Sequence, residues 1–117
     1  METELSKATV AVVRYDGTYN SFTHALDLCD GLECLKAGDK VLIKPNIVWG
    51  GLKSYPPFGR VTISTVVGYV LQALRDRGCR DITIGEGTVL NKELGSTTAR
   101  GFEWSGIGDV AKNTGRD

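Results

Sequence analysis

The chain has 117 residues, which is the size of one ordinary domain. Its 14 Lys and Arg residues balance 14 Asp and Glu residues, so we expect neither a nucleic-acid partner nor a membrane surface. Hydrophobic residues at 41% and charged residues at 24% exclude a mostly disordered chain. The N-terminus lacks a signal-peptide pattern and no apolar run is long enough to span a membrane. We therefore expect a cytoplasmic protein.

The cysteines are three, Cys29, Cys34 and Cys79, and no pair has CxxC spacing. An iron–sulfur cluster usually needs four closely spaced thiolates, so none is expected in this chain, and no other cofactor is indicated. A metal site that combines these thiols with His24, the single histidine, is the weaker alternative. We expect three reduced, mostly buried thiols and assign no metal ligand.

The first elements in chain order are a strand and a helix. Residues 9–15, TVAVVRY, are rich in β-branched side chains and precede an Asp-Gly turn, which predicts a strand. Apolar residues then recur at steps of three and four, which predicts a helix capped by Asn20 or Ser21 and ended at Gly38. Gly31 has a low helix propensity and lies in the middle of this segment, so the alternative to one helix is two shorter ones. The apolar positions are Phe22, Ala25, Leu26, Cys29, Leu32 and Leu35.

The second half repeats the order strand, helix, strand. Residues 40–44, KVLIK, read as a strand covered on both faces, closed by Pro45. After a Gly- and Pro-rich loop over 45–61, a helical stripe begins at Thr62 as the cap and ends at Gly78. Residues 81–85 predict a further strand, and the tail predicts two short helices over 98–104 and 107–113.

Strands separated by helices imply right-handed crossovers and a parallel sheet. We therefore predict an α/β fold with a small, parallel or mostly parallel sheet of about three strands, a Rossmann-like half domain. No internal repeat, low-complexity tract or linker divides the sequence, so residues 1–117 are expected to form a single domain.

Ligands of open parallel sheets bind at the carboxyl ends of the strands, where two motifs stand out. The first is Lys44-Pro45-Asn46, in which proline restricts Lys44 to extended geometry. An ammonium group held there can meet a carboxylate or phosphate, and the Asn46 amide can donate and accept beside it. The alternative is a solvated strand-end charge and a turn-forming asparagine.

The second motif is Gly85-Glu86-Gly87, which is followed by Thr88. Glycine on both sides permits positive φ or the close approach of a ligand. Glu86 is then a candidate general base, metal ligand or partner of Lys44, against the alternative of an exposed turn glutamate. Adjacent strands would bring Lys44 and Glu86 within ion-pair reach, whereas an intervening strand would leave a gap of about 10 Å. We assign Glu86 and Lys44 as catalytic candidates, and the ligand-binding candidates are Lys44, Asn46, Gly85, Gly87 and Thr88.

Two other patterns are weaker. Residues 106–111, GIGDVA, fit a dinucleotide fingerprint, but the preceding residues 101–105 are not a strand pattern, so we do not expect a nucleotide there. The aromatic residues of the long loop, Trp49, Tyr55 and Phe58, either line a pocket or, as we favour, anchor the loop to the domain.

The segments VLIKPNIVWG (41–50), TISTVVGYVLQALRDRGCRDITIGEG (62–87) and WSGIGDVAKNTG (104–115) resemble the family catalogued as domain of unknown function 362. The resemblance implies the fold and little chemistry. Many members of that family carry a ferredoxin-like segment with clustered cysteines, which this chain lacks. A fainter likeness is to the nickel-dependent lactate racemase group, whose histidine-bearing loop is replaced here by Gly85-Glu86-Gly87.

The family's domain normally continues with further strands after the segment that resembles 104–115. We therefore expect the chain to be the N-terminal portion of a longer domain, so that part of any active site is missing.

Two functional hypotheses follow. The first is an enzyme-like domain that binds a small anionic substrate or cofactor through Lys44, Asn46 and Glu86. The second is a non-catalytic binding or assembly module that completes its sheet with another chain, either a homo-oligomer or the missing C-terminal half.

Overall fold

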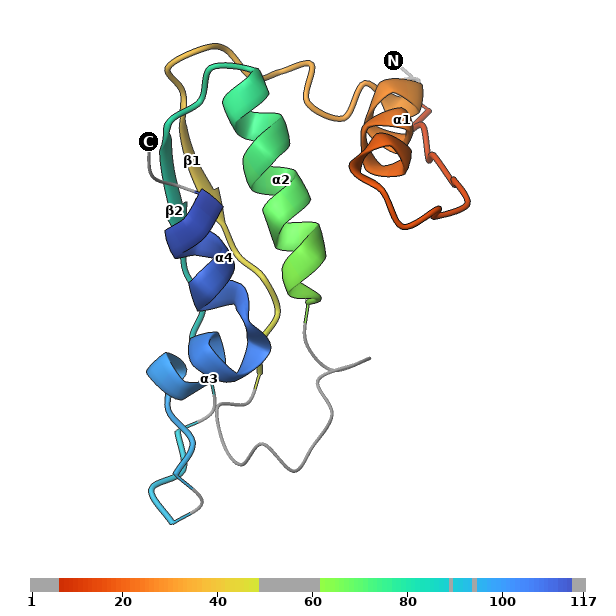
Figure 1. The fold of residues 1–117 in the computed structure, drawn as a ribbon. Helices are drawn as coiled ribbons and strands as arrows, with labels where there is room; N and C mark the ends of the chain where they lie inside the picture. The colour runs from red at the N-terminus through yellow and green to blue at the C-terminus, as the bar shows by residue number, and fades with distance from the viewer. Residues whose placement is uncertain (1–6, 49–61, 89, 94, 115–117) are drawn as a thin grey trace, which may run out of the picture. The chain divides into compact units, whose positions relative to one another are not determined.

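The computed structural model describes residues 7–48, 62–88, 90–93 and 95–114. The chain divides into two compact units, Met1–Leu35 and Lys36–Asp117. Helices and strands alternate along it as far as α3, which is followed by a further helix, as Figure 1 shows. In chain order the elements are α1 (Tyr19–Cys29), β1 (Lys40–Ile43), α2 (Ser64–Asp76), β2 (Asp81–Ile84), α3 (Thr98–Ser105) and α4 (Ile107–Thr114).

The first unit contains α1, which is shorter than the sequence pattern suggests. The helix begins after Thr18, not at Asn20 or Ser21, and Asp16 Oδ1 accepts hydrogen bonds from the Thr18 backbone N–H and hydroxyl at 2.9 and 2.6 Å. It ends at Asp30, which adopts a left-handed φ of 51°, and Gly31 N–H donates to the Leu26 carbonyl. The predicted weak point at Gly31 is therefore where the helix stops, and turns replace its expected second piece.

The strand predicted over 9–15 is not confirmed. The described residues of this segment carry no regular secondary structure, although exposed and half-buried positions alternate over residues 10–14 as in a strand. Val10 and Val12 are 82% and 89% exposed. A strand needs a ladder partner as well as propensity, and no ladder is assigned to this segment among the described residues.

The second unit is built on a parallel pair of strands. β1 and β2 pair in register from Lys40 opposite Asp81 to Ile43 opposite Ile84. The crossover between them contains α2, as the alternation of elements predicts. The α/β class and the parallel sheet are thus confirmed, with two strands in the described part of the chain.

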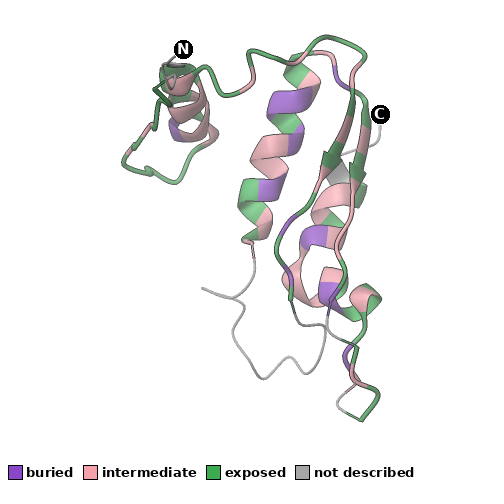
Figure 2. Cartoon of the chain, turned by 180° about the vertical axis from the view of Figure 1, so that it is seen from behind, coloured by how far each residue is buried: buried purple, intermediate pink, exposed green. Residues whose placement is uncertain are grey.

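The core lies on one face of this sheet. Ile43, Ile82 and Ile84 pack against a buried cluster drawn from the segment after β1, from α2 and from α4. The buried members are Ile47, Val67, Leu71 and Ile107. In Figure 2 buried and exposed positions alternate along α2, as expected of an amphipathic helix.

The opposite face of the sheet is open in the described structure. Leu42, which points away from the core, is 70% exposed, and exposed and half-buried residues alternate along both strands. The prediction of a strand covered on both faces is therefore wrong for β1. A continuous apolar run does not by itself distinguish a doubly covered strand from one with an exposed leucine.

The two tail helices match their predicted positions within a residue at each end. Gly106, with φ of 79°, ends α3 and allows α4 to start directly after it. The GIGDVA pattern thus joins two helices instead of following a strand, so it lacks the geometry of a dinucleotide site. Across the described residues, the helices are too short or too polar to cross a bilayer.

Candidate functional site

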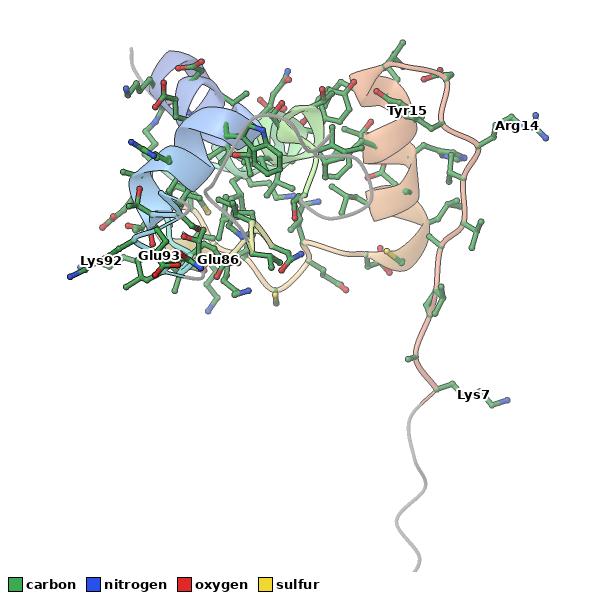
Figure 3. All side chains as sticks on the ribbon, turned by 90° about the horizontal axis from the view of Figure 1, so that it is seen from below. Lys7, Arg14, Tyr15, Glu86, Lys92 and Glu93 are labelled. Atoms are coloured by element: carbon green, nitrogen blue, oxygen red, sulfur yellow. The ribbon has the colours of Figure 1, made fainter. Side chains whose placement is uncertain are left out.

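The two strand-end motifs lie side by side because β1 and β2 are parallel neighbours. Lys44 follows the last residue of β1, and Glu86 follows β2 by two residues. Figure 3 looks onto this end of the sheet, with Glu86 labelled. The adjacent-strand alternative therefore holds, and Lys44 Nζ lies 3.1 Å from Glu86 Oε2.

The Glu86 carboxylate is the centre of this arrangement. Its side chain is only 7% exposed. Oε2 accepts hydrogen bonds from Lys44 Nζ and from the Ile47 backbone N–H, both at 3.1 Å, and Oε1 accepts from the Gly87 N–H at 2.9 Å. One carboxylate thus links the loop after β1 to the loop after β2.

These donors set the protonation state of Glu86. The hydrogen bond from the Ile47 N–H and then that from the Lys44 ammonium group hold the pKa of Glu86 below its ordinary value, against the opposing effect of desolvation. A carboxylate with a lowered pKa is ionised at neutral pH and is a weaker base. Of the three roles considered for Glu86, the contacts favour that of partner to Lys44.

Lys44 is the more accessible member of the pair, with 64% of its side chain exposed. An ammonium group has three donors, and the contact with Glu86 uses one of them. Because most of the side chain is exposed, the other two remain accessible from solvent. Lys44 can therefore contact a further acceptor without leaving Glu86.

The chain after Lys44 is held in place by buried groups. Pro45 is buried and Ile47 is fully buried. Asn46 N–H donates to Thr62 Oγ1 at 2.9 Å, and Thr62 N–H donates to the Asn46 carbonyl at 2.7 Å. Thr62 was expected to cap α2, but the N-cap is Ile63, and the Thr62 hydroxyl instead fixes the loop after β1.

The remaining predicted ligand-binding residues lie at the same edge of the sheet but make different contacts; they are Gly85, Gly87 and Thr88. Gly85 N–H donates to the Ile43 carbonyl at 2.9 Å and so extends the ladder by one bond. A side chain at Gly87 would meet open space, but neither Gly85 nor Gly87 has a positive φ. Thr88 is buried, and its N–H and hydroxyl lie 3.4 Å from the Thr98 hydroxyl at the start of α3. Thr88 thus anchors the loop to α3.

Sequence reasoning missed three contributors to the site: the Ile47 N–H, Thr62 and Thr98. The backbone group has no sequence signature. The two threonines stand at the starts of predicted helices, Thr62 as the cap and Thr98 as the first helical residue, where a hydroxyl is usually interpreted as part of the helix start. Trp49, Tyr55 and Phe58, the candidate pocket aromatics, lie outside the described residues.

The described residues contain no cluster of three or more side chains suited to a metal ion. The thiols differ from the expectation of mostly buried groups, because only Cys79 is buried while Cys29 is half-buried and Cys34 is exposed. Cys79 Sγ donates to the Lys36 carbonyl at 3.4 Å, as a small packed side chain at the end of the α2 turn.

Comparison with known proteins identifies the second unit. A family model described as "Domain of unknown function (DUF362)" matches residues 41–116, which include both strand-end motifs and all elements from β1 onward except Lys40. No curated protein and no solved structure matches the chain. The fainter likeness to lactate racemases stays a prediction. The match spans well over half of the chain, which therefore belongs to the family described as Domain of unknown function (DUF362).

Proposed function

We propose that the strand-end edge binds a small anionic molecule through Lys44, with Glu86 as the group that positions it. The observation that supports this most strongly is the contrast within the pair: a carboxylate 7% exposed holds an ammonium group 64% exposed. A buried carboxylate with three donors orients the lysine, and the lysine presents its remaining donors to solvent. Such a preorganised donor costs less to order on binding than a free surface lysine.

The neighbouring groups suit an acceptor-rich ligand. Asn46 is exposed beside Lys44, and Gly87 leaves open space at the surface. The edge is also where ligands of parallel sheets bind in general. A carboxylate or phosphate oxygen is the matching partner for an ammonium group, and the ligand class is accordingly a small phosphorylated or carboxylated metabolite.

In this proposal Glu86 is not the general base. Its lowered pKa and its three hydrogen bonds make it a poor proton acceptor at neutral pH. It keeps Lys44 protonated and in place, so its removal acts on ligand affinity through Lys44.

The proposal is tested with a matched pair of lysines. Lys44→Gln removes the charge and keeps an amide that can donate to Glu86, and Lys40→Gln removes the charge of the Lys40–Asp81 pair (3.9 Å) at the other end of the same strands. A thermal-shift screen of phosphorylated and carboxylated metabolites identifies a ligand, and calorimetry gives its affinity.

We expect Lys44→Gln to weaken binding by about ten- to a hundredfold, which corresponds to about 1.5–3 kcal/mol for a charge-assisted contact. Lys40→Gln should leave the affinity unchanged. A ligand whose affinity is the same in Lys44→Gln and wild type would place binding elsewhere and would contradict the proposal.

A second candidate function is assembly with another chain. The observation in its favour is the open sheet face, where Leu42 is 70% exposed, on a sheet with two strands in the described part of the chain. Small sheets are marginal by themselves and are usually completed by further strands or covered by helices. In this function Lys44 and Glu86 fasten the two loops together and bind no ligand.

A further inference from the structure

A cavity of about 320 Å³ lies within the second unit, and its lining includes neither Lys44 nor Glu86. It is formed between the core face of β2 and the helices α2, α3 and α4, which Figure 1 shows on this unit. Its size is at the lower end of the range of small-molecule sites, about 300–1,000 Å³.

The apolar part of the cavity comes from regularly spaced positions. Ile82 and Ile84 are the inward-facing residues of β2, and Leu71 lies on α2 one turn before Arg75, so both helix residues share one face. Phe102 of α3 adds an aromatic ring to the lining. This wall suits a hydrocarbon body rather than a sugar or a nucleotide phosphate.

The polar part consists of two arginines at one end. Arg75 is in the last turn of α2 and Arg80 directly precedes β2, so the short connection between the two elements brings both guanidinium groups to the cavity. Arg80 and Ile84 are four residues apart along an extended chain, a separation of about 13 Å. The cavity is therefore charged at the start of β2 and apolar toward its end.

Helix capping does not account for Arg75. The last carbonyls of α2 already accept backbone hydrogen bonds: Arg77 N–H donates to Ala73 and Leu74, Gly78 N–H to Arg75, and Cys79 N–H to Leu74, at 2.8–3.3 Å. Within the described part of the chain, the Arg75 guanidinium has no hydrogen-bond or ion-pair partner. Among the described residues that line the cavity, none carries a carboxylate.

We infer that this cavity binds a small monocarboxylate with an apolar body. The carboxylate meets Arg75 and Arg80, whose planar guanidinium groups match its two oxygens, and the body lies against Ile82, Ile84 and Phe102. Charge complementarity selects this class, because the two guanidinium groups attract an anion and repel a cation. This site is independent of the anion site proposed at Lys44.

The test uses hexanoate and its neutral analogue hexanamide as probes, followed by amide NMR shifts in the full chain. We expect hexanoate to shift the amides of Leu71, Ile82 and Phe102 with a dissociation constant in the range of about 0.1–5 mM, and hexanamide to bind at least about tenfold more weakly. Ala111→Leu, which places a larger side chain on the cavity wall, should abolish the binding of both probes.

Three arginine variants distinguish binding at this cavity from a non-specific effect of positive charge. Arg75→Gln and Arg80→Gln should each lower the affinity for hexanoate by about tenfold or more. Arg77→Gln changes an arginine of the same connection that does not line the cavity, and it should leave that affinity unchanged. Lys44→Gln should leave the hexanoate-induced shifts at Leu71, Ile82 and Phe102 unchanged, which distinguishes this site from the one at the strand ends. Equal binding of the two probes, an equal loss in Arg77→Gln, or no shift at about 10 mM hexanoate would overturn the inference.

Discussion

At the scale of single residues, Glu86 connects the ends of both strands. Its two oxygens accept three hydrogen bonds from groups that are distant in sequence or on the next residue: Lys44 Nζ, Ile47 N–H and Gly87 N–H. A buried polar group of this kind stabilises the fold when all its partners are present and destabilises it when one is removed. Glu86 therefore has a structural role that is separate from any ligand.

The pH dependence of stability follows from the lowered pKa of Glu86. A carboxyl group whose pKa is lower in the folded than in the unfolded chain stabilises the fold above the unfolded pKa, about 4.3. That contribution is lost as the pH falls through the lower, folded pKa. We expect Glu86→Gln to lower the thermal midpoint at pH 7, and the gap from wild type to narrow below about pH 4.

The matched control for this measurement is Glu93→Gln, at an exposed glutamate of the same unit that Figure 3 also labels. Its thermal midpoint should follow that of wild type at every pH. Thermal scans from pH 3 to 7 supply the data. A gap between Glu86→Gln and wild type that stays constant through the acid range would show that the charge of Glu86 is not what stabilises the loops.

At the scale of elements, α2 ends in a turn that only glycine fits without strain. Gly78 has φ of 85°, and a Cβ placed there would lie 2.9 Å from Ala37 Cβ. Gly38 has φ of 88°, but a Cβ placed there would have no neighbour within 4 Å. Both glycines therefore have a left-handed backbone, and only Gly78 would also bring an added side chain into a clash.

We expect Gly38→Ala to cost about 1 kcal/mol of unfolding free energy and Gly78→Ala about 2–4 kcal/mol, because the latter adds a clash to the left-handed backbone. Urea unfolding followed by circular dichroism measures both. Equal losses of unfolding free energy in the two variants would mean that Ala37 moves away from the added methyl group at no cost, which would contradict the prediction.

Most of the elements in the second unit could be predicted from the sequence because their signals are local. The apolar spacing of α2, the β-branched residues of β2 and the glycine at 106 between α3 and α4 each act within one element. The segment 9–15 has an equally local strand signal and no strand. What it requires is a partner, and pairing between distant segments is not encoded in propensity.

The site was predictable to the same extent. That Lys44 and Glu86 lie at the same edge follows from their positions at the ends of two parallel strands, but the sequence left open whether those strands are neighbours, and so whether the two side chains meet. The role of Glu86 was not predictable, because it depends on the N–H of Ile47 and on how deeply the side chain is buried. The left-handed φ of 63° at Val48, directly after Ile47, likewise has no signal in a β-branched residue.

At the scale of the whole molecule, the open face of the sheet bears on association. Exposed apolar side chains on a small sheet with unpaired edges favour contacts between chains. We expect sedimentation velocity to show association that increases with protein concentration, and Leu42→Asp to shift it toward the monomer. Leu90→Asp, at a leucine 76% exposed outside the sheet, is the control and should behave as wild type. A strict monomer over about a hundredfold range of concentration would contradict assembly through this face.

Binding of an anion through Lys44 at the carboxyl ends of β1 and β2 can be observed residue by residue. The most direct measurement is an amide NMR titration of the chain with inorganic phosphate, on wild type and Lys44→Gln. We expect saturable shifts that cluster at Lys44, Ile47, Glu86 and Gly87 in wild type, and an affinity for phosphate that falls by about tenfold or more in Lys44→Gln. Shifts that gather elsewhere, or that are the same in both proteins, would contradict it.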